Sequence, residues 1–256
     1  MTTPIEISHQ QLKDAVYQQL QSEIVSGALP PGTLLREAGL SARLNVSKTP
    51  LRDALVRLQK DGFVEISPYR SAVVSGYSRT DLREIYELRE LIEGACARQA
   101  AQYIETDALA ELAQVVRNSA ACVRDGAVIP GREAELAETL DQFDAIMYAH
   151  ARNSRLEGIL DNLRNHITRI GQLTARIPGR LVKSVDEHQG IYEAIVRRDG
   201  ASAEDLMRRH IFSVMADQLV EFEEGGTTSD APQRLDGDIS MEQPHAASST
   251  QEARVV

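Results

Sequence analysis

A stretch near the N-terminus, residues 46–63 (VSKTPLRDALVRLQKDGF), gathers hydroxyl and basic side chains at the start of an expected helix. The hydroxyls of Ser47 and Thr49, with the free amides of a helix N-terminus, can take phosphate oxygens because this end of a helix favours anions. Lys48 and Arg52 can neutralise phosphate or donate to the O6 and N7 atoms of guanine. The stretch therefore predicts either a helix that lies against a polyanion or an ordinary amphipathic helix with a solvated basic face.

The bulk composition is that of an ordinary globular protein. Apolar residues make up 42% of the 256 residues and charged residues 26%, and no apolar run approaches the roughly 20 residues of a membrane-spanning helix. The first residues, MTTPIEISHQQLKD, lack a basic start followed by an apolar core, so export is not expected. Cys96 and Cys122 form no CxxC pair and are predicted to be buried, reduced thiols. These features favour a cytoplasmic protein with no membrane partner.

The charge is spread unevenly along the chain. The net charge is -10, yet residues 1–78 hold eight basic and seven acidic residues, so the acidity lies in the remainder. Between residues 43 and 70 there are six basic residues and three acidic ones. This asymmetry is typical of a small DNA-facing module attached to an acidic body.

The elements that would position the basic helix can be read from the pattern around it. Apolar residues at intervals of four from Leu12 to Ile24 predict a first helix, and REAGLSARLN predicts a short second one. FVEI and SAVVS predict two strands joined by a tight loop, whose Tyr69 and Arg70 are placed to touch the DNA backbone or minor groove. Three helices followed by a small hairpin indicate a winged helix-turn-helix domain, expected over residues 1–78.

The rest of the chain changes to long helical patterns. We expect helices at about 79–104, 106–125, 132–151, 154–177, 180–198 and 202–223. Their natural assembly is an all-α bundle over residues 79–223, which makes the protein mostly α. Residues 224–256 are rich in Gly, Ser, Thr and Pro and contain no aromatic residue, so they are expected to be a disordered tail.

The segment SKTPLRDALVRLQKDGFVEI resembles the SRTPVREALRRLEAEGLVE element of GntR-type bacterial transcription regulators, and IVSGALPPGTLLREAGLSARLNV resembles their lead-in. Together the two segments cover nearly all of residues 10–76. Two positions depart from the family pattern: Ala38, where the family is often basic, and Ser71, in place of the usual glycine of the wing. The resemblance implies a DNA-binding domain with contacts from Ser47, Lys48, Thr49, Arg52, Tyr69 and Arg70.

The later segment DEHQGIYEAIVRRDGASAEDLMRRHI resembles the ending of the FCD ligand-binding domain found in the FadR branch of GntR regulators. The resemblance covers approximately residues 80–222, and the six expected helices suit the VanR-like subgroup. It implies an antiparallel six-helix bundle whose central cavity receives small organic acids, often beside a divalent metal.

The family's metal ligands are an Asp and a His four residues apart, followed by two later His. The resemblance carries the later pair onto His188 and His210 and the earlier pair onto Leu140 and Asp144. Leu140 cannot bind metal, although Asp141 shares a face with Asp144 and could substitute. Asp144, His188 and His210 could still hold Zn, Ni or Mn. Two alternatives stay open: the histidines bind the carboxylate of an effector directly, or they are ordinary hydrogen-bonded histidines of the bundle.

Two arginines are further candidates for effector binding. Arg89 stands where the family has an arginine that could clamp a carboxylate bidentately, and the alternative is a salt bridge to Glu93 one helical turn on. Arg169, on the fourth helix of the bundle, is a candidate of the same kind. His166 is expected at the surface, with the cavity as the alternative.

The residues and the resemblance favour a metabolite-responsive transcription regulator rather than an enzyme. We expect a homodimer that represses from a palindromic operator and is released by a small organic acid. The alternative is a metal-dependent enzyme of the helical bundle with an appended DNA-binding-like module. A carboxylate-bridged bundle enzyme needs two inward-facing Glu-x-x-His motifs, and the expected bundle over residues 79–223 contains none.

Overall fold

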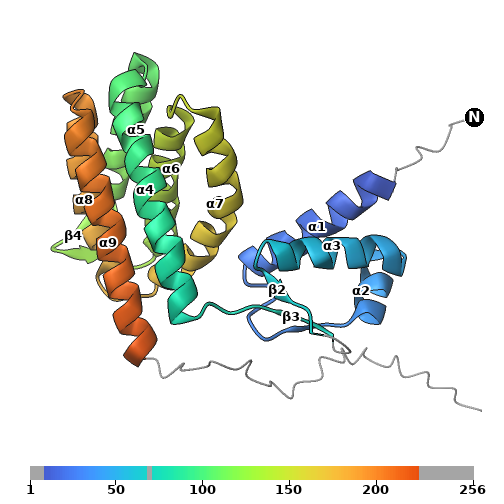
Figure 1. Cartoon of the computed structure of the whole chain (residues 1–256). Coiled ribbons are helices and arrows are strands. Elements are labelled where there is room, and N and C mark those ends of the chain that lie inside the picture. Colours follow the sequence, from blue (N-terminus) through green and yellow to red (C-terminus); the bar gives the residue numbers. More distant parts are fainter. Residues whose placement is uncertain (1–8, 68–70, 225–256) are drawn as a thin grey trace, which may run out of the picture.

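The structure is a computed structural model and describes residues 9–67 and 71–224. Tyr69 and Arg70, expected at the tip of the wing, and the predicted tail from residue 225 lie outside the described residues. Figure 1 displays the described elements as two groups, a small N-terminal one and a larger helical one, joined by the segment between β3 and α4.

The N-terminal group holds three helices around one apolar core. The helices are α1 (His9–Val25), α2 (Glu37–Leu44) and α3 (Lys48–Lys60). Leu51, Leu55 and Leu58 of α3 are at most 3% exposed and pack against α1, α2 and the sheet. Apolar residues thus recur along one side of α3, and its other side is left to solvent, as the amphipathic pattern predicts.

A three-stranded antiparallel sheet completes this domain. Its strands are β1 (Leu34–Leu35), β2 (Val64–Glu65) and β3 (Ala72–Val74), in the order β1-β3-β2. The pattern predicted β2 and β3 but not β1. Strand β1 pairs with the free edge of β3, where Val74 donates to the backbone oxygen of Thr33 at 3.0 Å. Pairing this edge satisfies backbone groups that would otherwise stay open.

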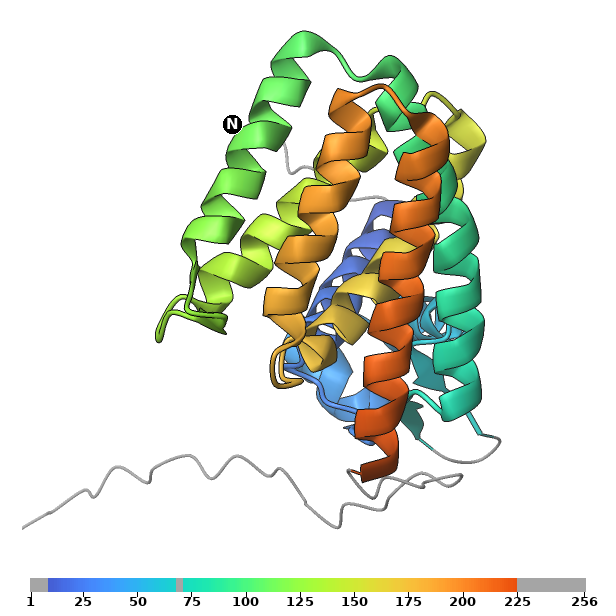
Figure 2. The ribbon, with the colours of Figure 1, turned by 90° about the vertical axis from the view of Figure 1, so that its left-hand side faces the viewer.

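The helical group is a bundle with its own core. Its helices are α4 (Arg79–Tyr103), α5 (Thr106–Ala121), α6 (Glu133–Ala149), α7 (Ser154–Thr174), α8 (Arg180–Val196) and α9 (Gly200–Glu224). Figure 2 displays α8 and α9 in front, with α5 and α6 to one side and α4 to the other. Helices α4 and α9 approach closely at Gly94, where an added Cβ would lie 2.8 Å from Cγ of Arg208. Predicted and observed helices agree to within a few residues at most ends.

One segment of the bundle differs from its prediction. Helix α5 ends at Ala121 instead of about residue 125, and a hairpin of β4 (Val123–Arg124) and β5 (Ala127–Val128) follows. Asp125 and Gly126 have φ values of 53° and 73°, which is the backbone of a two-residue hairpin turn and cannot continue a helix. An Asp-Gly pair after a helical pattern is both a helix-stop signal and a strong hairpin signal.

Cys96 and Cys122 are both free and buried, and burial raises the pKa of the Cys96 thiol to about 12. Both thiols therefore stay protonated and unreactive. Within residues 9–67 and 71–224, no helix is both long and apolar enough to cross a membrane.

The start of α4 provides a test of the fold. The Ser78 hydroxyl accepts from the backbone N–H of Asp81, whose carboxylate accepts from the N–H of Ser78 in return. We expect Ser78→Ala to cost about 1 kcal/mol, a drop of about 2–4 °C in Tm, measured by circular dichroism. Thr106→Ala is the control: it removes an exposed hydroxyl from the first turn of α5, where no side chain caps the helix. An equal drop in both variants would contradict the capping role.

Candidate functional site

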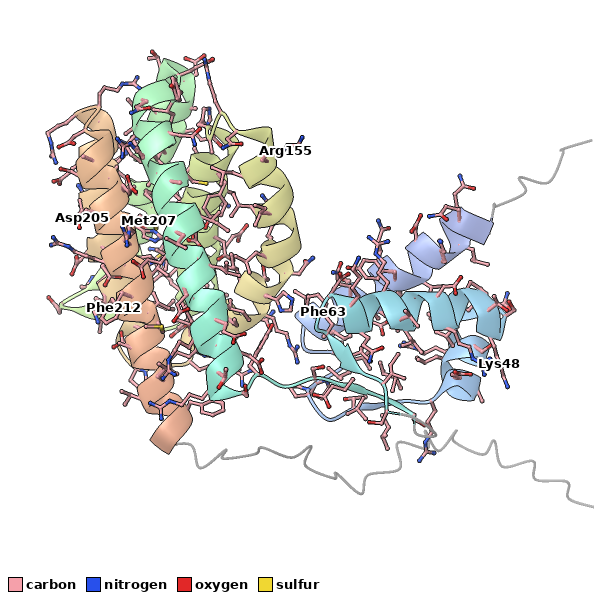
Figure 3. All side chains as sticks on the ribbon, viewed as in Figure 1. Lys48, Phe63, Arg155, Asp205, Met207 and Phe212 are labelled. Carbon is pink, nitrogen blue, oxygen red and sulfur yellow. The ribbon has the colours of Figure 1, made fainter. Side chains whose placement is uncertain are left out.

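The N-terminal end of α3 presents its polar side chains to solvent. Ser47, Lys48, Thr49 and Arg52 are all exposed, and Figure 3 displays Lys48 at the end of α3 that lies away from the bundle. Ser47 is the N-cap residue with an extended backbone, but its hydroxyl makes no capping hydrogen bond. The four side chains predicted to contact DNA therefore lie together on one accessible end of a helix.

Arg52 is held by an acidic residue of α2. Its Nε lies 2.8 and 3.0 Å from the two carboxylate oxygens of Glu37, and this hydrogen bond lowers the pKa of Glu37. The pair is solvent-exposed, so it adds little to stability, but it limits the directions in which the guanidinium can point.

The other two arginines of this region are engaged within the domain. Arg43 forms an ion pair with Glu23 at 2.7 Å. Arg57 pairs with Asp14 at 3.1 Å, and its guanidinium lies 3.8 Å from the centre of the Tyr17 ring. Both side chains therefore pair with acidic residues on the surface of the domain, as Arg52 does with Glu37.

Inside the bundle, three helices bring Asp144, His188 and His210 together. His188 of α8 and His210 of α9 are 3% and 6% exposed, with ring centroids 4.7 Å apart. Asp144 of α6 has its Oδ1 3.9 Å from Nε2 of His188. Phe143 stacks on the His188 ring at 4.3 Å and covers it with apolar surface. The sequence prediction that these three residues converge is thus supported by the geometry.

Several buried polar atoms of this region have no hydrogen-bond partner within the described part of the chain. They are Oδ1 of Asp144, both nitrogens of His188, the Tyr148 hydroxyl and Oε2 of Glu93. Burial raises the pKa of Asp144 well above its usual value and lowers that of His188 well below it. Both shifts favour the uncharged forms, because ionised groups are costly away from water. Buried polar groups without partners are rare in native proteins, so these atoms call for a partner such as ordered water, an ion or a ligand.

His210, unlike His188, is fixed by the protein. Its Nδ1 lies 2.6 Å from Oε2 of Glu187, and the same oxygen accepts from the fully buried Arg180. Although burial raises the pKa of Glu187, the hydrogen bonds from His210 and Arg180 prevail and lower it to about 2. Glu187 is therefore ionised and holds the orientation of the His210 ring.

The predicted metal set fits only in part. Asp144 and His188 bring unpartnered atoms close together, but in residues 9–67 and 71–224 no three His, Cys, Asp or Glu side chains are arranged to hold a metal. Leu140 joins an apolar cluster with Leu136, Val185 and Cys122 and supplies no metal-ligating atom at its position. Asp141 is exposed and does not replace it. FCD domains as a class can bind metals, but the side chains here do not form the three-ligand site that was expected.

Arg89 forms the salt bridge that was the alternative to effector binding. It is 6% exposed and points inward, and its Nε donates to Oε1 of Glu93 at 2.7 Å. Its guanidinium also lies 4.9 Å from the centre of the Tyr86 ring. The salt bridge to Glu93 therefore exists inside the bundle rather than on its surface.

Arg169 and His166 lie elsewhere than expected. Arg169 donates to the backbone oxygen of Ser75 at the junction with the N-terminal domain, so it does not join the cluster of His188 and His210. His166 is neither at the free surface nor in the cavity, because its Nε2 contacts the backbone oxygen of Asp61. Both side chains of α7 face the DNA-binding domain, a direction that helical periodicity alone could not assign.

Sequence reasoning missed the residues that support the cluster. Arg180, Ser184 and Glu187 recur along one face of α8 and make the hydrogen-bond network that ends at His210. Tyr148 stands one turn after Asp144 on α6. The available signal was a charged or polar residue at each turn of an otherwise apolar face. The sequence alone does not identify the partners of such residues.

Comparisons with known proteins agree with this architecture. Residues 12–74 match the family "Bacterial regulatory proteins, gntR family", and residues 84–213 match the FCD domain. "HTH-type transcriptional repressor RspR" of Escherichia coli strain K12 is 26% identical over 202 residues, which are 79% of this chain and 86% of that relative. "Probable D-xylose utilization operon transcriptional repressor" of Paenarthrobacter nicotinovorans is 27% identical over 74% of this chain and 80% of that relative.

Among solved structures, E. coli McbR/YncC matches with a TM-score of 0.64 over 84% of this chain and 99% of that one. At 19% identity this match is a likeness of fold. The FCD match spans half of the chain, and the gntR match covers the helix-turn-helix and its sheet. The chain therefore belongs to the GntR family of DNA-binding transcription regulators, in the FadR-like branch with a C-terminal FCD domain, and is a regulator rather than an enzyme.

Proposed function

We propose that this cytoplasmic regulator is a repressor that binds a palindromic operator as a homodimer and is released when a small organic acid binds inside the bundle. Two relatives named as repressors support the direction of regulation. The observation that carries the effector site is the set of buried polar atoms without partners around Asp144 and His188. A native bundle keeps such atoms when a ligand supplies the missing hydrogen bonds.

The chemistry of the cluster suits a carboxylate. The Tyr148 hydroxyl and one nitrogen of a neutral His188 can donate, and Asp144 with its raised pKa can donate while protonated. Arg89 also lies nearby, paired with Glu93. We therefore favour direct binding of the acid by these side chains over a metal-mediated site, because only two of the expected metal ligands bring free atoms together.

A thermal-shift screen of mono-, di- and hydroxy-carboxylic acids tests the effector site. A true effector at one hundred times its Kd should stabilise the protein by about 2.7 kcal/mol. His188→Ala should abolish the shift, and His150→Ala, which removes a histidine bonded within its own helix, should keep it. No shift with any acid would contradict the proposal. A shift that disappears with a chelator and returns with Zn, Ni or Mn would replace direct binding by the metal reading.

We also propose that Ser47, Lys48, Thr49 and Arg52 are the DNA contacts, with the N-terminal end of α3 in the major groove. Their exposure together on one end of the helix supports this. The contacts predicted for Tyr69 and Arg70 stay predictions.

Alanine substitutions test the groove helix. Lys48→Ala should weaken operator binding and lower the slope of log affinity against log salt by about one unit. Arg52→Ala should cost about 1–3 kcal/mol if the side chain reads guanine, and relax specificity at that base. Arg43→Ala removes an equal charge already paired with Glu23 and serves as the control. Equal effects of all three variants, measured by fluorescence anisotropy titrations over a range of salt, would refute the assignment.

The bundle offers an apolar surface for the homodimer. Leu91 of α4 is 62% exposed, and Phe212 and Val220 of the neighbouring α9 are 59% and 54% exposed. Figure 3 labels Phe212 on the outer side of α9. Exposed large apolar residues on two adjacent helices support a contact with a second copy, since a single recognition helix covers too few base pairs for useful specificity.

The double variant Leu91→Glu/Phe212→Glu tests this surface. Light scattering should find a dimer for the parent and a monomer for the variant, because carboxylates buried in an apolar interface are costly. Ile159→Glu changes a similarly exposed apolar residue of α7, 50% exposed, and should stay dimeric. A monomeric parent, or dissociation by Ile159→Glu alone, would overturn the proposed interface.

A further inference from the structure

His166 belongs to the bundle but makes both of its hydrogen bonds outside it. Nε2 lies 2.8 Å from the backbone oxygen of Asp61, and Nδ1 lies 2.9 Å from the Tyr77 hydroxyl. A backbone oxygen can only accept, so Nε2 carries the proton and Nδ1 accepts from Tyr77. Burial lowers the pKa of His166, which keeps the ring in this neutral form. One tautomer of one residue thus satisfies two contacts across the junction.

These contacts reach the C-terminal end of the DNA-recognition helix. Asp61 is the C-cap of α3, and Tyr17 fixes its carboxylate from within the domain at 2.7 Å. The His166 ring stacks on Phe63 with centroids 4.3 Å apart and planes 8° apart, and Phe63 is a core residue with 1% exposure. In Figure 3, Phe63 lies near the bundle and Lys48 at the opposite end of α3. His166 therefore contacts the end of α3 that is remote from the DNA-binding residues.

Other contacts also cross the junction between the two domains. Helix α1 lies against α7, where a Cβ added at Gly27 would lie 3.8 Å from Oε1 of Gln172. Arg169, one turn along α7, donates to the backbone oxygen of Ser75, and its guanidinium lies 4.9 Å from the Tyr77 ring. Part of the junction is open to solvent: a pocket of about 670 Å³ lies between the end of the recognition helix and the start of α4, and His166 is part of its wall. A partly open junction resists bending less than a packed one, so each bridging side chain matters more.

A small tilt of α3 about its C-terminal end becomes a large displacement of its N-terminal end. The helix has 13 residues and is therefore about 20 Å long. A tilt of about 10° about its C-terminal end moves the N-terminal end by about 3 Å, close to the 3.4 Å rise of one base pair along a strand. The orientation fixed at His166 thus determines where Lys48 and Arg52 meet the DNA.

We propose that His166 is a positioning residue for DNA recognition, which selects the spacing between the two operator half-sites by fixing the recognition helix to the bundle. The proposal rests on the homodimer and the palindromic operator proposed above. In a dimer the bundles fix the distance between the two DNA-binding domains, and His166 fixes the direction of each α3 relative to its bundle. Half-site affinity depends on α3 itself, whereas spacing preference depends on this junction.

The experiment measures affinity for operators whose half-sites are separated by spacers that differ by single base pairs. The parent should prefer one spacer. His166→Ala should bind a single half-site as the parent does, but lose roughly fivefold or more of its preference, the factor for one typical net hydrogen bond. Tyr77→Phe removes the hydroxyl that contacts Nδ1 but keeps the His166–Asp61 contact, and should give a smaller loss in a folded protein. His166→Gln, whose amide can still donate to Asp61, should recover part of the preference.

His150→Ala is the matched control, because it removes a histidine of the same bundle that bonds to Ile146 of its own helix. An unchanged spacer profile in both His166→Ala and Tyr77→Phe overturns the positioning role and leaves the repressor proposal intact. A parent dimer without any spacer preference refutes the palindromic operator and the role of His166 with it. A fall in half-site affinity equal to the fall on the full operator also overturns the proposal, because it would mean general damage to the DNA-binding domain.

Discussion

The charge of Arg180 has to be neutralised inside a helical bundle, and much of the surrounding structure follows from that. Its side chain is fully buried, at 0% exposure. An unpaired guanidinium at such a position would cost a large part of the free energy of unfolding of a domain. It donates to the hydroxyls of Ser184 and Ser213 and to the carboxylates of Asp217 and Glu187. These contacts join the start of α8 to the second half of α9 and give the bundle a specific register at that end.

The same network decides which histidine is free. Glu187 binds both Arg180 and Nδ1 of His210, so His210 is oriented by the protein itself. His188, the next residue of α8, lies between Phe143 and His210 and has no hydrogen-bond partner in the described chain. One histidine is therefore a fixed wall of the cluster, and the other offers unsatisfied nitrogens. Polar groups held in this way are the arrangement from which a preorganised ligand site is built.

Helix α7 links this region to the DNA-binding domain. At its end, Thr174 donates to Oε1 of Gln218 on α9, and the same oxygen accepts from the Tyr86 hydroxyl of α4. The Tyr86 ring in turn lies beside Arg89. In its middle, α7 carries His166, which contacts the end of α3. A single helix thus contacts both the buried polar region and the recognition helix, so a shift of α7 would change the contacts at both places.

The local pattern was enough to predict most elements and the exposed end of α3. Helix stops, caps and apolar stripes act within one or two turns, so Ser47 at the start of α3 and the helices α4 to α9 could be read directly. The hairpin at Asp125 and Gly126 was missed because the same dipeptide ends helices and turns hairpins, and the local sequence does not choose between them. Strand β1 was missed because its pairing partner β3 lies far away in the sequence.

The candidate site, too, could be predicted from the sequence only in part. The sequence, through its family resemblance, indicated Asp144, His188 and His210 as candidate site residues and Leu140 as the position where one ligand is lost. Only the tertiary structure decided that Glu187 orients His210, that Asp144 and His188 bring together two ligands rather than three, and that Arg169 and His166 turn to the DNA-binding domain. Periodicity fixes which face of a helix a residue occupies. What that face meets depends on the rotation and crossing of helices packed from distant parts of the chain, and this is set by the whole core.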